Sequence, residues 1–428
     1  MDKSSLRQII IDQQRQVFQK RAIPRDVHNK LLELTKINQV VIITGIRRCG
    51  KSTELQLIRE QLPEKNYYLN FDDERLLSFK VEDFQILYEV FIELYGEQQT
   101  FYFDEIQNVP DWERFIRRLH DQGNKVFITG SNASMFSSEL GTRLTGRHVT
   151  LRMHPFSFKE FVLSKTGKNS IEISDDLTTT ENVYFKTLFN EYISQGGFPE
   201  YITNNSQEYL ISLYNNIIYR DIITRYKINN EKALRELSLY LSSNVGKDVS
   251  YNKLKKMLGL GSTTTVSEYC EYLSNSFLCF FINRYDYSLK KQLASSKKAY
   301  FIDSGLSQAI GFRFSDDYGR FLENSVFLEL SRQEHTEIYF HRDKYECDFI
   351  TRQGKTITSA IQVCQHIHDG NKERELNGVV EAAEKYKLKN VYLLTEDETE
   401  TITNEHFTIH ILPTWKWMLN LKKTSNIP

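Results

Sequence analysis

The sequence predicts an α/β fold in which a parallel sheet is followed by a helix-rich unit and then by a second, mixed α/β unit. The β-branched run at 39–44 has the composition of a buried parallel strand. Extended and helical segments alternate from there to about residue 130, which favours a parallel sheet with crossover helices. Helical patterns dominate 187–286, and strands alternate with helices again after residue 323.

The composition excludes several classes of protein. The 428 residues are 40% hydrophobic and 26% charged, which is typical of a globular chain of two or three domains. The 55 Lys and Arg residues balance 56 Asp and Glu residues, so any contact with nucleic acid or anionic lipid has to be local. The five cysteines form no Cys-x-x-Cys pair, and no window of 18 apolar residues exists. The sequence therefore predicts a cytoplasmic protein without a membrane partner.

A phosphate-binding loop directly follows the first predicted strand. The residues GIRRCGKS match G-x-x-x-x-G-K-[ST] and precede a predicted helix at 53–61, which is the context that the binding mechanism needs. Glycines let backbone N–H groups surround a phosphate, and the helix N-terminus adds its dipole. The alternative is a glycine-rich turn without a ligand. The nucleotide-binding residues predicted here are Gly45, Ile46, Arg47, Arg48, Cys49, Gly50, Lys51, Ser52 and Thr53.

Three residues of this loop have more specific expectations. Lys51 is expected on the β- and γ-phosphates of ATP, and the hydroxyl of Ser52 on Mg²⁺. Because a helix N-terminus lowers thiol pKa values, the position of Cys49 predicts either a lowered pKa or, more simply, a small residue that fills the loop.

A second apolar strand, at 100–103, delivers two carboxylates at its C-terminal end, Asp104 and Glu105. After a phosphate loop such a segment is typical of a Walker B element. Asp104 is then expected to hold Mg²⁺, and Glu105 to polarise the attacking water. The alternative is an acidic helix cap.

Polar residues follow the next predicted strand, at 125–129. In a doubly wound sheet Asn132 would lie beside the γ-phosphate, and it is the predicted sensor. Further on, Arg143 or Arg147 could neutralise charge on the transferred phosphoryl group, in cis or across a subunit boundary. A surface salt bridge is the equal alternative for either arginine.

Together with GGFPEY at 196–201, these segments resemble the bacterial and archaeal AAA-type P-loop ATPases that carry a C-terminal domain of unknown function. They are similar to the signal-transduction ATPases with numerous domains. The resemblance covers most of the chain and implies a nucleotide-sensing lid at the Gly-Gly-x-Pro motif, although a helix-ending turn would also explain these residues. The implied order is an N-terminal helical segment at 1–36, a P-loop core at 37–186, a helical lid at 187–230, a winged-helix unit at 231–310 and a C-terminal domain at 311–428.

The helix-rich unit fits a winged helix. Helices are expected at 232–242, 251–258 and 263–274, and a β-wing from 277–285. The helix that would contact DNA bases in this unit carries threonines and Glu268. Two functions of the unit therefore stay equal alternatives: binding of double-stranded DNA, and an intramolecular relay role. The residues that make the unit locally basic, and so suit DNA phosphates, are Lys253, Lys255, Lys256, Lys290, Lys291, Lys297 and Lys298.

The C-terminal unit resembles the PD-(D/E)XK, or restriction-endonuclease-like, fold. Glu323 lies on a predicted helix, Asp348 on a strand, and Gln362 and Cys364 on the next strand. Nucleases of this fold need an acid and a lysine where this chain has Gln362 and Cys364, so little or no cleavage is expected.

Two smaller expectations concern the same unit. Cys364, His366 and His368 alternate and could share a strand face as metal ligands. Because only three donors are visible, a half-buried strand that runs into a loop is favoured. Residues 394–404 are expected to form a solvated loop.

The sequence therefore predicts an ATPase that works as a switch. ATP and Mg²⁺ bind at the loop, and slow hydrolysis changes how the lid, the winged helix and the C-terminal unit are arranged. Two alternatives stay open: a DNA-binding regulator whose ATP site tunes its affinity, and an adaptor for an unknown protein partner in which the nucleotide only stabilises the fold.

Overall fold

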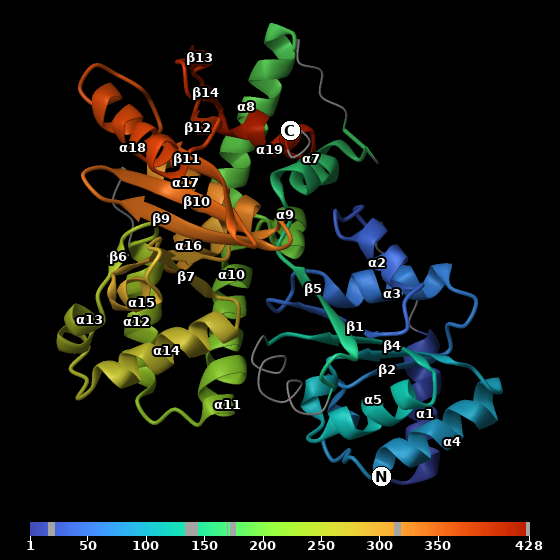
Figure 1. Ribbon diagram of the computed structural model, residues 1–428. Coiled ribbons are helices and arrows are strands. Elements are labelled where there is room, and N and C mark those ends of the chain that lie inside the picture. Colours follow the sequence, from blue (N-terminus) through green and yellow to red (C-terminus); the bar gives the residue numbers. More distant parts are fainter. Residues whose placement is uncertain (16–21, 133–143, 169, 172–176, 312–317, 425–428) are drawn as a thin grey trace. The chain divides into compact units, whose positions relative to one another are not determined.

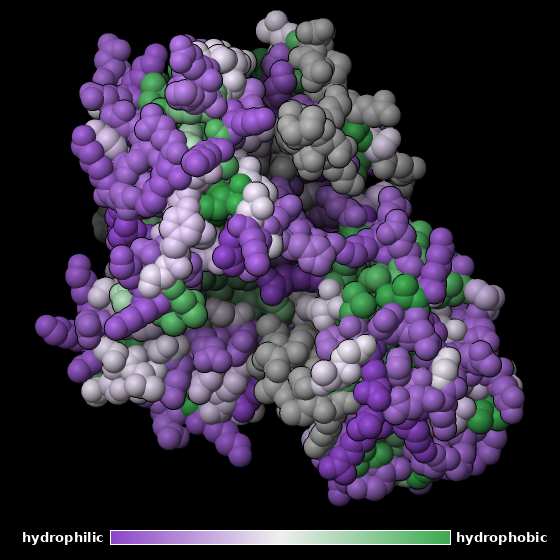
Figure 2. Space-filling view, viewed as in Figure 1, coloured by the Kyte–Doolittle hydropathy of each residue, from purple (hydrophilic) through white to green (hydrophobic). Residues whose placement is uncertain are grey.

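A computed structural model describes residues 1–15, 22–132, 144–168, 170–171, 177–311 and 318–424 (Figure 1). The chain divides into two compact units. Unit 1 comprises 1–154 with 275–277, and unit 2 comprises 155–274 with 278–428. None of the helices in the described ranges is long and apolar enough to cross a membrane. The face drawn in Figure 2 is mostly hydrophilic, with apolar residues scattered among charged ones, as the composition leads one to expect.

The described part of unit 1 is built on a five-stranded parallel sheet, which confirms the predicted α/β class for this part of the chain. Its strand order is β2-β3-β4-β1-β5, so β4 lies between the strand that enters the phosphate loop and the strand that carries the paired carboxylates. The strands are β1 Val40–Gly45, β2 Tyr67–Asn70, β3 Thr100–Asp104, β4 Lys125–Gly130 and β5 His148–Met153.

Helices cover both faces of this sheet (Figure 1). Alternate residues of β1 to β4 point to one face, where they form a single core with the apolar stripes of α1, α4 and α5. Phe84 and Phe115 stack there with ring centroids 4.4 Å apart. The helices of unit 1 are α1 Lys3–Arg15, α2 His28–Leu34, α3 Lys51–Gln61, α4 Asp83–Tyr95 and α5 Trp112–Asp121, with short 3-10 turns η1 Glu74–Leu76 and η2 Ile106–Asn108.

Unit 2 begins with helices. Two of them open with complete capping boxes, in which Ser157 pairs with Glu160 and Thr178 with Glu181, and these caps define where the helices start. The helices are α7 Phe158–Thr166, α8 Thr179–Gln195, α9 Pro199–Asn204, α10 Gln207–Asn216, the π-helical η4 Ile217–Ile223, α11 Thr224–Tyr226, α12 Glu231–Ser243, α13 Tyr251–Met257, α14 Thr263–Asn275, α15 Leu289–Ala294, α16 Ser304–Ile310, α17 Tyr318–Ser331, α18 Lys372–Tyr386 and α19 Thr414–Thr424.

A mixed nine-stranded sheet forms the rest of unit 2 and follows the order β13-β14-β12-β11-β10-β9-β7-β8-β6. β7 and β9 pair in parallel, so the strands expected for the β-wing and those expected for the C-terminal domain share one sheet. The winged-helix and nuclease-like assignments stay predictions. The strands are β6 Asp248–Val249, β7 Cys279–Arg284, β8 Lys297–Phe301, β9 Thr336–Arg342, β10 Glu346–Gln353, β11 Thr356–Val363, β12 Asn390–Thr395, β13 Glu400–Thr403 and β14 Thr408–Pro413.

The expectation of a loop throughout 394–404 is wrong. Residues 400–403 form β13, an edge strand that pairs antiparallel with β14. Its polar composition hides the strand, because only Ile402 packs against the core while its neighbours face solvent.

Candidate functional site

The predicted phosphate loop connects β1 to α3. A Cβ atom on Gly45 would lie 2.1 Å from the carbonyl oxygen of Met153, so only glycine fits between the loop and β5. Gly50 has a φ of +107°, a backbone conformation that side-chain-bearing residues rarely adopt. The backbone therefore turns tightly and leaves the N-terminus of α3 directly after the loop.

Lys51 lies inside this loop and is only 3% exposed. Its Nζ donates to the carbonyl oxygen of Ile46 at 3.2 Å and forms an ion pair with Glu105 Oε1 at 3.5 Å. Burial is the largest single effect on Lys51 and alone would lower its pKa, but the charge of Glu105 together with smaller contributions from Cys49 and Asp104 outweighs it, and the pKa is raised. Burial alone would likewise raise the pKa of Glu105, but Lys51, Arg47 and the hydrogen bonds from Gln107 and Ser131 together outweigh burial, so its pKa is lowered. Both groups are thus charged at neutral pH.

Two hydroxyl groups meet on one carboxylate oxygen of Asp104. Ser52 Oγ donates to Asp104 Oδ1 at 3.0 Å, and Thr129 Oγ1 donates to the same atom. Asp104 is 1% exposed, and its Oδ2 has no hydrogen-bond partner among the described residues. A buried, unpartnered carboxylate oxygen beside a serine hydroxyl suits a hard divalent cation, so these residues fit Mg²⁺.

Because a proton and Mg²⁺ compete for the carboxylate of Asp104, Mg²⁺ binding there should depend on pH. Burial, and next the charge on Glu105, raises the pKa of Asp104 to about 6. Below that pH the carboxyl is protonated and cannot bind a cation, so the gain in ATP affinity that Mg²⁺ supplies should fall about tenfold per pH unit below 6. Calorimetric titrations with and without Mg²⁺ between pH 5 and 8 measure this gain. Asp104→Asn should show no such pH dependence, and an unchanged Mg²⁺ gain at pH 5 in the natural chain would contradict the assignment.

The C-terminal end of β4 adds further polar groups beside Glu105. The Glu105 backbone N–H donates to Thr129 Oγ1 at 2.9 Å, and Gln107 Nε2 donates to Glu105 and, at 3.3 Å, to Ser131 Oγ. Asn132, the predicted sensor, is fully buried directly after this segment. Thr129 and Gln107 were not predicted. Thr129 ends the predicted strand at 125–129, and the pairing of β3 with β4 brings it to the two carboxylates.

The structure bears differently on the predictions for Arg143, Arg147 and Cys49. Arg143 lies outside the described residues. Arg147 Nε donates to Asp121 Oδ1 at 3.0 Å, which is the salt bridge that the sequence left open as an alternative. Cys49 is fully buried and burial raises its pKa, so the expectation of a lowered thiol pKa is wrong and Cys49 fills the loop.

Three other predicted loop residues occupy the approach to α3. Arg47 forms an ion pair with Asp72 at 3.8 Å, and Arg48 adopts a left-handed backbone with a φ of 67°. Thr53 lies half-buried in the first turn of α3.

Arg25 is a residue at this loop that the sequence did not reveal. Its Nη1 donates to the Cys49 carbonyl at 2.7 Å and its Nη2 to the His154 carbonyl at 2.6 Å. The guanidinium therefore joins the phosphate loop to the end of β5. No local pattern marks Arg25, because its partners are backbone atoms that lie far away in sequence.

The Gly-Gly-x-Pro motif is closely packed within unit 2. The Gly197 backbone N–H donates to Asp303 Oδ2 at 2.6 Å, and a Cβ on Gly196 would lie 2.1 Å from Asp303 Oδ1. A Cβ on Gly197 would lie 2.3 Å from the Phe156 carbonyl oxygen. These contacts explain both glycines by packing, and the nucleotide-sensing role stays a prediction.

Seven lysines were assigned from the sequence to a basic surface that suits DNA, and for one of them, Lys298, this assignment is wrong. Lys298 is 3% exposed and contacts carboxylates, so it is unavailable to DNA phosphates. Lys255 and Lys297 are half-buried, and Lys253, Lys256, Lys290 and Lys291 are exposed.

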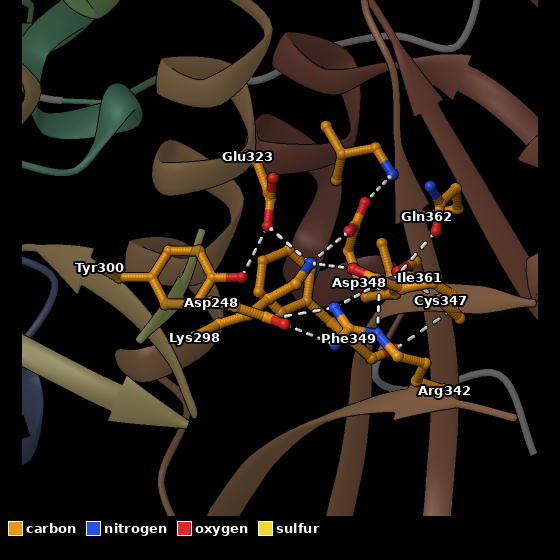
Figure 3. Close-up of polar contacts among 12 residues, drawn as sticks. Asp248, Lys298, Tyr300, Glu323, Arg342, Cys347, Asp348, Phe349, Ile361 and Gln362 are labelled. Atoms are coloured by element: carbon orange, nitrogen blue, oxygen red, sulfur yellow. Dashed lines mark hydrogen bonds and ion pairs between the residues drawn. The ribbon is translucent and has the colours of Figure 1, made fainter. Parts of the chain in front are cut away.

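The structure brings together three of the residues predicted from the nuclease resemblance (Figure 3). Glu323 of α17 and Asp348 of β10 both contact Lys298 Nζ, and Gln362 of β11 accepts from the Asp348 backbone N–H at 3.1 Å. Gln362 Nε2 in turn donates to Glu375 Oε2 at 2.7 Å. These carboxylates and Gln362 line a cavity of about 750 Å³.

The alternating Cys364, His366 and His368 do not form a metal centre in the described part of the chain. The group there with ligand atoms close enough for a metal is instead His341, Asp343 and Glu381. Burial raises the pKa of Cys364 to about 12. β11 ends at Val363, so Cys364, His366 and His368 follow the strand and do not share a strand face.

Comparisons with known proteins match two separate segments of the chain to families. Residues 37–162 match the family described as an AAA domain, and residues 186–317 match a domain of unknown function, DUF8612. An uncharacterised protein of Methanocaldococcus jannaschii is 34% identical, over 98% of this chain and 96% of its own length. An uncharacterised protein of Haemophilus influenzae is 31% identical, over 81% of this chain and 87% of its own.

Solved structures are more distant. The Walker-type ATPase of Pyrococcus abyssi is 14% identical with a TM-score of 0.42, and covers 68% of this chain and 96% of its own. The RuvB Holliday junction branch migration motor of Thermotoga maritima is 17% identical with a TM-score of 0.30, and covers 68% of this chain and 99% of its own. With the phosphate loop, the parallel sheet and two relatives that each cover more than four fifths of the chain, the chain belongs to the family of archaeal and bacterial proteins in which an AAA-type P-loop ATPase domain is followed by DUF8612.

Proposed function

We propose that unit 1 binds ATP with Mg²⁺ and hydrolyses it, and that the nucleotide state switches the arrangement of the rest of the chain. The observation that carries this proposal is the convergence on Asp104. Two hydroxyls share its Oδ1, its buried Oδ2 has no partner in the described chain, and the charged pair of Lys51 and Glu105 lies beside it.

The contact between Lys51 and Glu105 suggests how binding prepares hydrolysis. A triphosphate offers Lys51 a stronger anionic partner than one carboxylate, so Lys51 turns to the β- and γ-phosphates. Glu105 then loses its ion pair and is free to accept a proton from the attacking water. Gln107 and the N–H to Thr129 keep Glu105 in place meanwhile. Bound through Ser52 and Asp104, Mg²⁺ would neutralise charge on the phosphates.

The other predicted residues take supporting roles in this proposal. Asn132, which is buried after β4, would sense the γ-phosphate, and Arg143 or Arg147 would stabilise developing charge. For Arg147 this requires its ion pair with Asp121 to open.

The sharing of one sheet by β7, β8 and β9 restricts what the switch can move. Since the strands of the predicted wing and of the C-terminal domain hydrogen-bond to each other, we infer that they move as one body. The switch then acts between unit 1 and this body.

Phosphate release by the natural chain and by Lys51→Ala tests the proposal. Loss of the ammonium should reduce turnover by at least about 10²-fold, since one preorganised charge contact is worth that much in comparable sites. Lys65→Ala is the matched control, because Lys65 is exposed and its ion-pair partner in the described part of the chain is the surface residue Glu60. Equal turnover in the natural chain and Lys51→Ala would refute the assignment, and tight ATP binding without any phosphate release would favour the adaptor.

A second candidate function is regulation of DNA binding, which the exposed Lys253, Lys256, Lys290 and Lys291 favour. Adding duplex DNA to the same assay tests it. If DNA is a partner, it should change phosphate release by the natural chain in a salt-dependent way, and should not affect a Lys290→Glu/Lys291→Glu protein. No effect of DNA on either protein would exclude this candidate.

A further inference from the structure

A buried lysine in unit 2 is surrounded by carboxylates from two different elements (Figure 3). Lys298 Nζ, at the start of β8, lies 2.8 Å from Asp348 Oδ1 and 2.8 Å from Glu346 Oε1, both on β10. Glu323 Oε1 of α17 lies 3.3 Å away on another side. An ammonium has three N–H donors, so Lys298 can satisfy each of them with a different carboxylate.

Each of these carboxylates is held in place by another group. The Val363 backbone N–H donates to Asp348 Oδ2 at 3.1 Å, and the Tyr300 hydroxyl donates to Glu323 Oε1 at 2.6 Å. Arg342 Nε donates to Glu346 Oε2 at 2.6 Å and also binds Asp248 through its two terminal nitrogens. Fixed outer partners that orient a ring of carboxylates are the arrangement found around bound cations.

Carboxylates that converge from separate elements on one point form a site that suits a hard divalent cation. Here Lys298 Nζ already occupies that point, with three oxygens at 2.8 to 3.3 Å. With Lys298 between them, these oxygens lie farther apart than the ligand atoms of His341, Asp343 and Glu381, and they would have to draw together to bind a metal ion. The ammonium blocks this movement, and its charge would repel a metal ion strongly in this buried setting. The site can therefore hold one cation or the other.

We propose that Lys298 is the built-in cation of this carboxylate site and keeps it closed to divalent metal ions. The ammonium takes the place of the metal and at the same time ties β8 to α17 and β10. Glu323, Glu346 and Asp348 also line the neighbouring cavity of about 750 Å³, and the charge of Lys298 partly offsets their negative charge there. This inference does not depend on ATP binding in unit 1.

Terbium ions test the proposal, because Tb³⁺ prefers carboxylate oxygens and its emission is sensitised by a nearby tyrosine. Tyr300 donates to Glu323 and so lies within range. All titrations use the full chain without nucleotide and with Asp104→Asn, which removes the predicted cation ligand of unit 1. The protein with Lys298 should show no saturable Tb³⁺ binding that depends on Asp348, whereas Lys298→Met should gain such a site and bind Tb³⁺ there at least about tenfold more tightly.

Two further variants locate the ion and control for the loss of a lysine. Lys297→Met changes the neighbouring half-buried lysine on the same strand and should behave as the protein that retains Lys298. Adding Tyr300→Phe to Lys298→Met should remove most of the sensitised emission without removing Mn²⁺ binding, which is measured by paramagnetic resonance. These results together place the gained ion among Glu323, Glu346 and Asp348.

Two results would overturn the proposal. The first is saturable metal binding by the protein with Lys298 that disappears on Asp348→Asn, because the site would then accept a metal beside the lysine. The second is a folded Lys298→Met protein without any gain. If Lys298→Met unfolds, the double variant Lys298→Met/Glu346→Gln allows the same comparison, because it carries less unpaired charge. Refolding of Lys298→Met by Mn²⁺ would also support the proposal.

Discussion

Glu105→Gln is expected to lower kcat for ATP hydrolysis by about 10²- to 10⁴-fold while MgATP still binds. Glutamine keeps the size of the side chain and can still contact Gln107, but it cannot accept a proton from water. It also removes the partner of Lys51, which lies 3.5 Å from Glu105 Oε1, so ATP affinity should be equal or higher. Single-turnover phosphate release and equilibrium nucleotide binding separate these two effects.

Glu97→Gln is a suitable control, because Glu97 is exposed and follows α4 away from the loop. Gln107→Ala should give an intermediate loss of kcat, since Gln107 only positions Glu105. Unchanged turnover in Glu105→Gln would show that another group activates the water.

Gly305→Ala should reduce the free energy of unfolding of unit 2 by about 3 kcal/mol or more, because it inserts a methyl group into a close contact. The added Cβ would lie 1.9 Å from the carbonyl oxygen of Gln195, a backbone atom at the end of α8. Neither α8 nor α16 can give way without disturbing the contact between Gly197 and Asp303.

Gly319→Ala provides a control of opposite sign. Gly319 also lies in a helix, but no atom of the described residues is within 4 Å of its Cβ position, so alanine should stabilise α17 by about 0.5–1 kcal/mol. Chemical unfolding followed by tryptophan fluorescence measures both, with Trp112→Phe to leave only the buried Trp415 and Trp417 of unit 2 as reporters. If Gly305→Ala is as stable as Gly319→Ala, the close packing of α8 on α16 is wrong.

The sequence predicted where most residues of the candidate nucleotide site lie in the fold, because their placement depends on local patterns. The phosphate loop specifies its own turn through Gly45 and Gly50, and the apolar strand before Asp104 indicates where the carboxylates emerge. The order of strands then brings Ser52 and Asp104 together, as expected. Arg25 escaped prediction because its partners are carbonyl groups from distant segments, which leave no trace in a sequence pattern.

The buried cluster in unit 2 shows the limit of reading charge from sequence. Lys298 stands next to another lysine in a segment that looks basic and exposed, yet alternation along β8 turns it inward while Lys297 is only half-buried. Its partners follow 25 to 50 residues later, on α17 and on β10, and only the tertiary fold, with the strand order β10-β9-β7-β8, brings them close. The sequence placed Glu323 on a helix and Asp348 and Gln362 on neighbouring strands, as the structure does. It did not reveal that Lys298 lies between Glu323 and Asp348.

Calorimetric titration of the folded chain with ATP, with and without Mg²⁺, is the most direct measurement of whether residues 45–52 and Asp104 form a nucleotide site. We expect one ATP per chain, binding that is weakened when Mg²⁺ is withdrawn, and no binding by a folded Lys51→Ala protein. Absence of any heat of binding by the natural chain, with circular dichroism showing it to be folded, would contradict the proposed function.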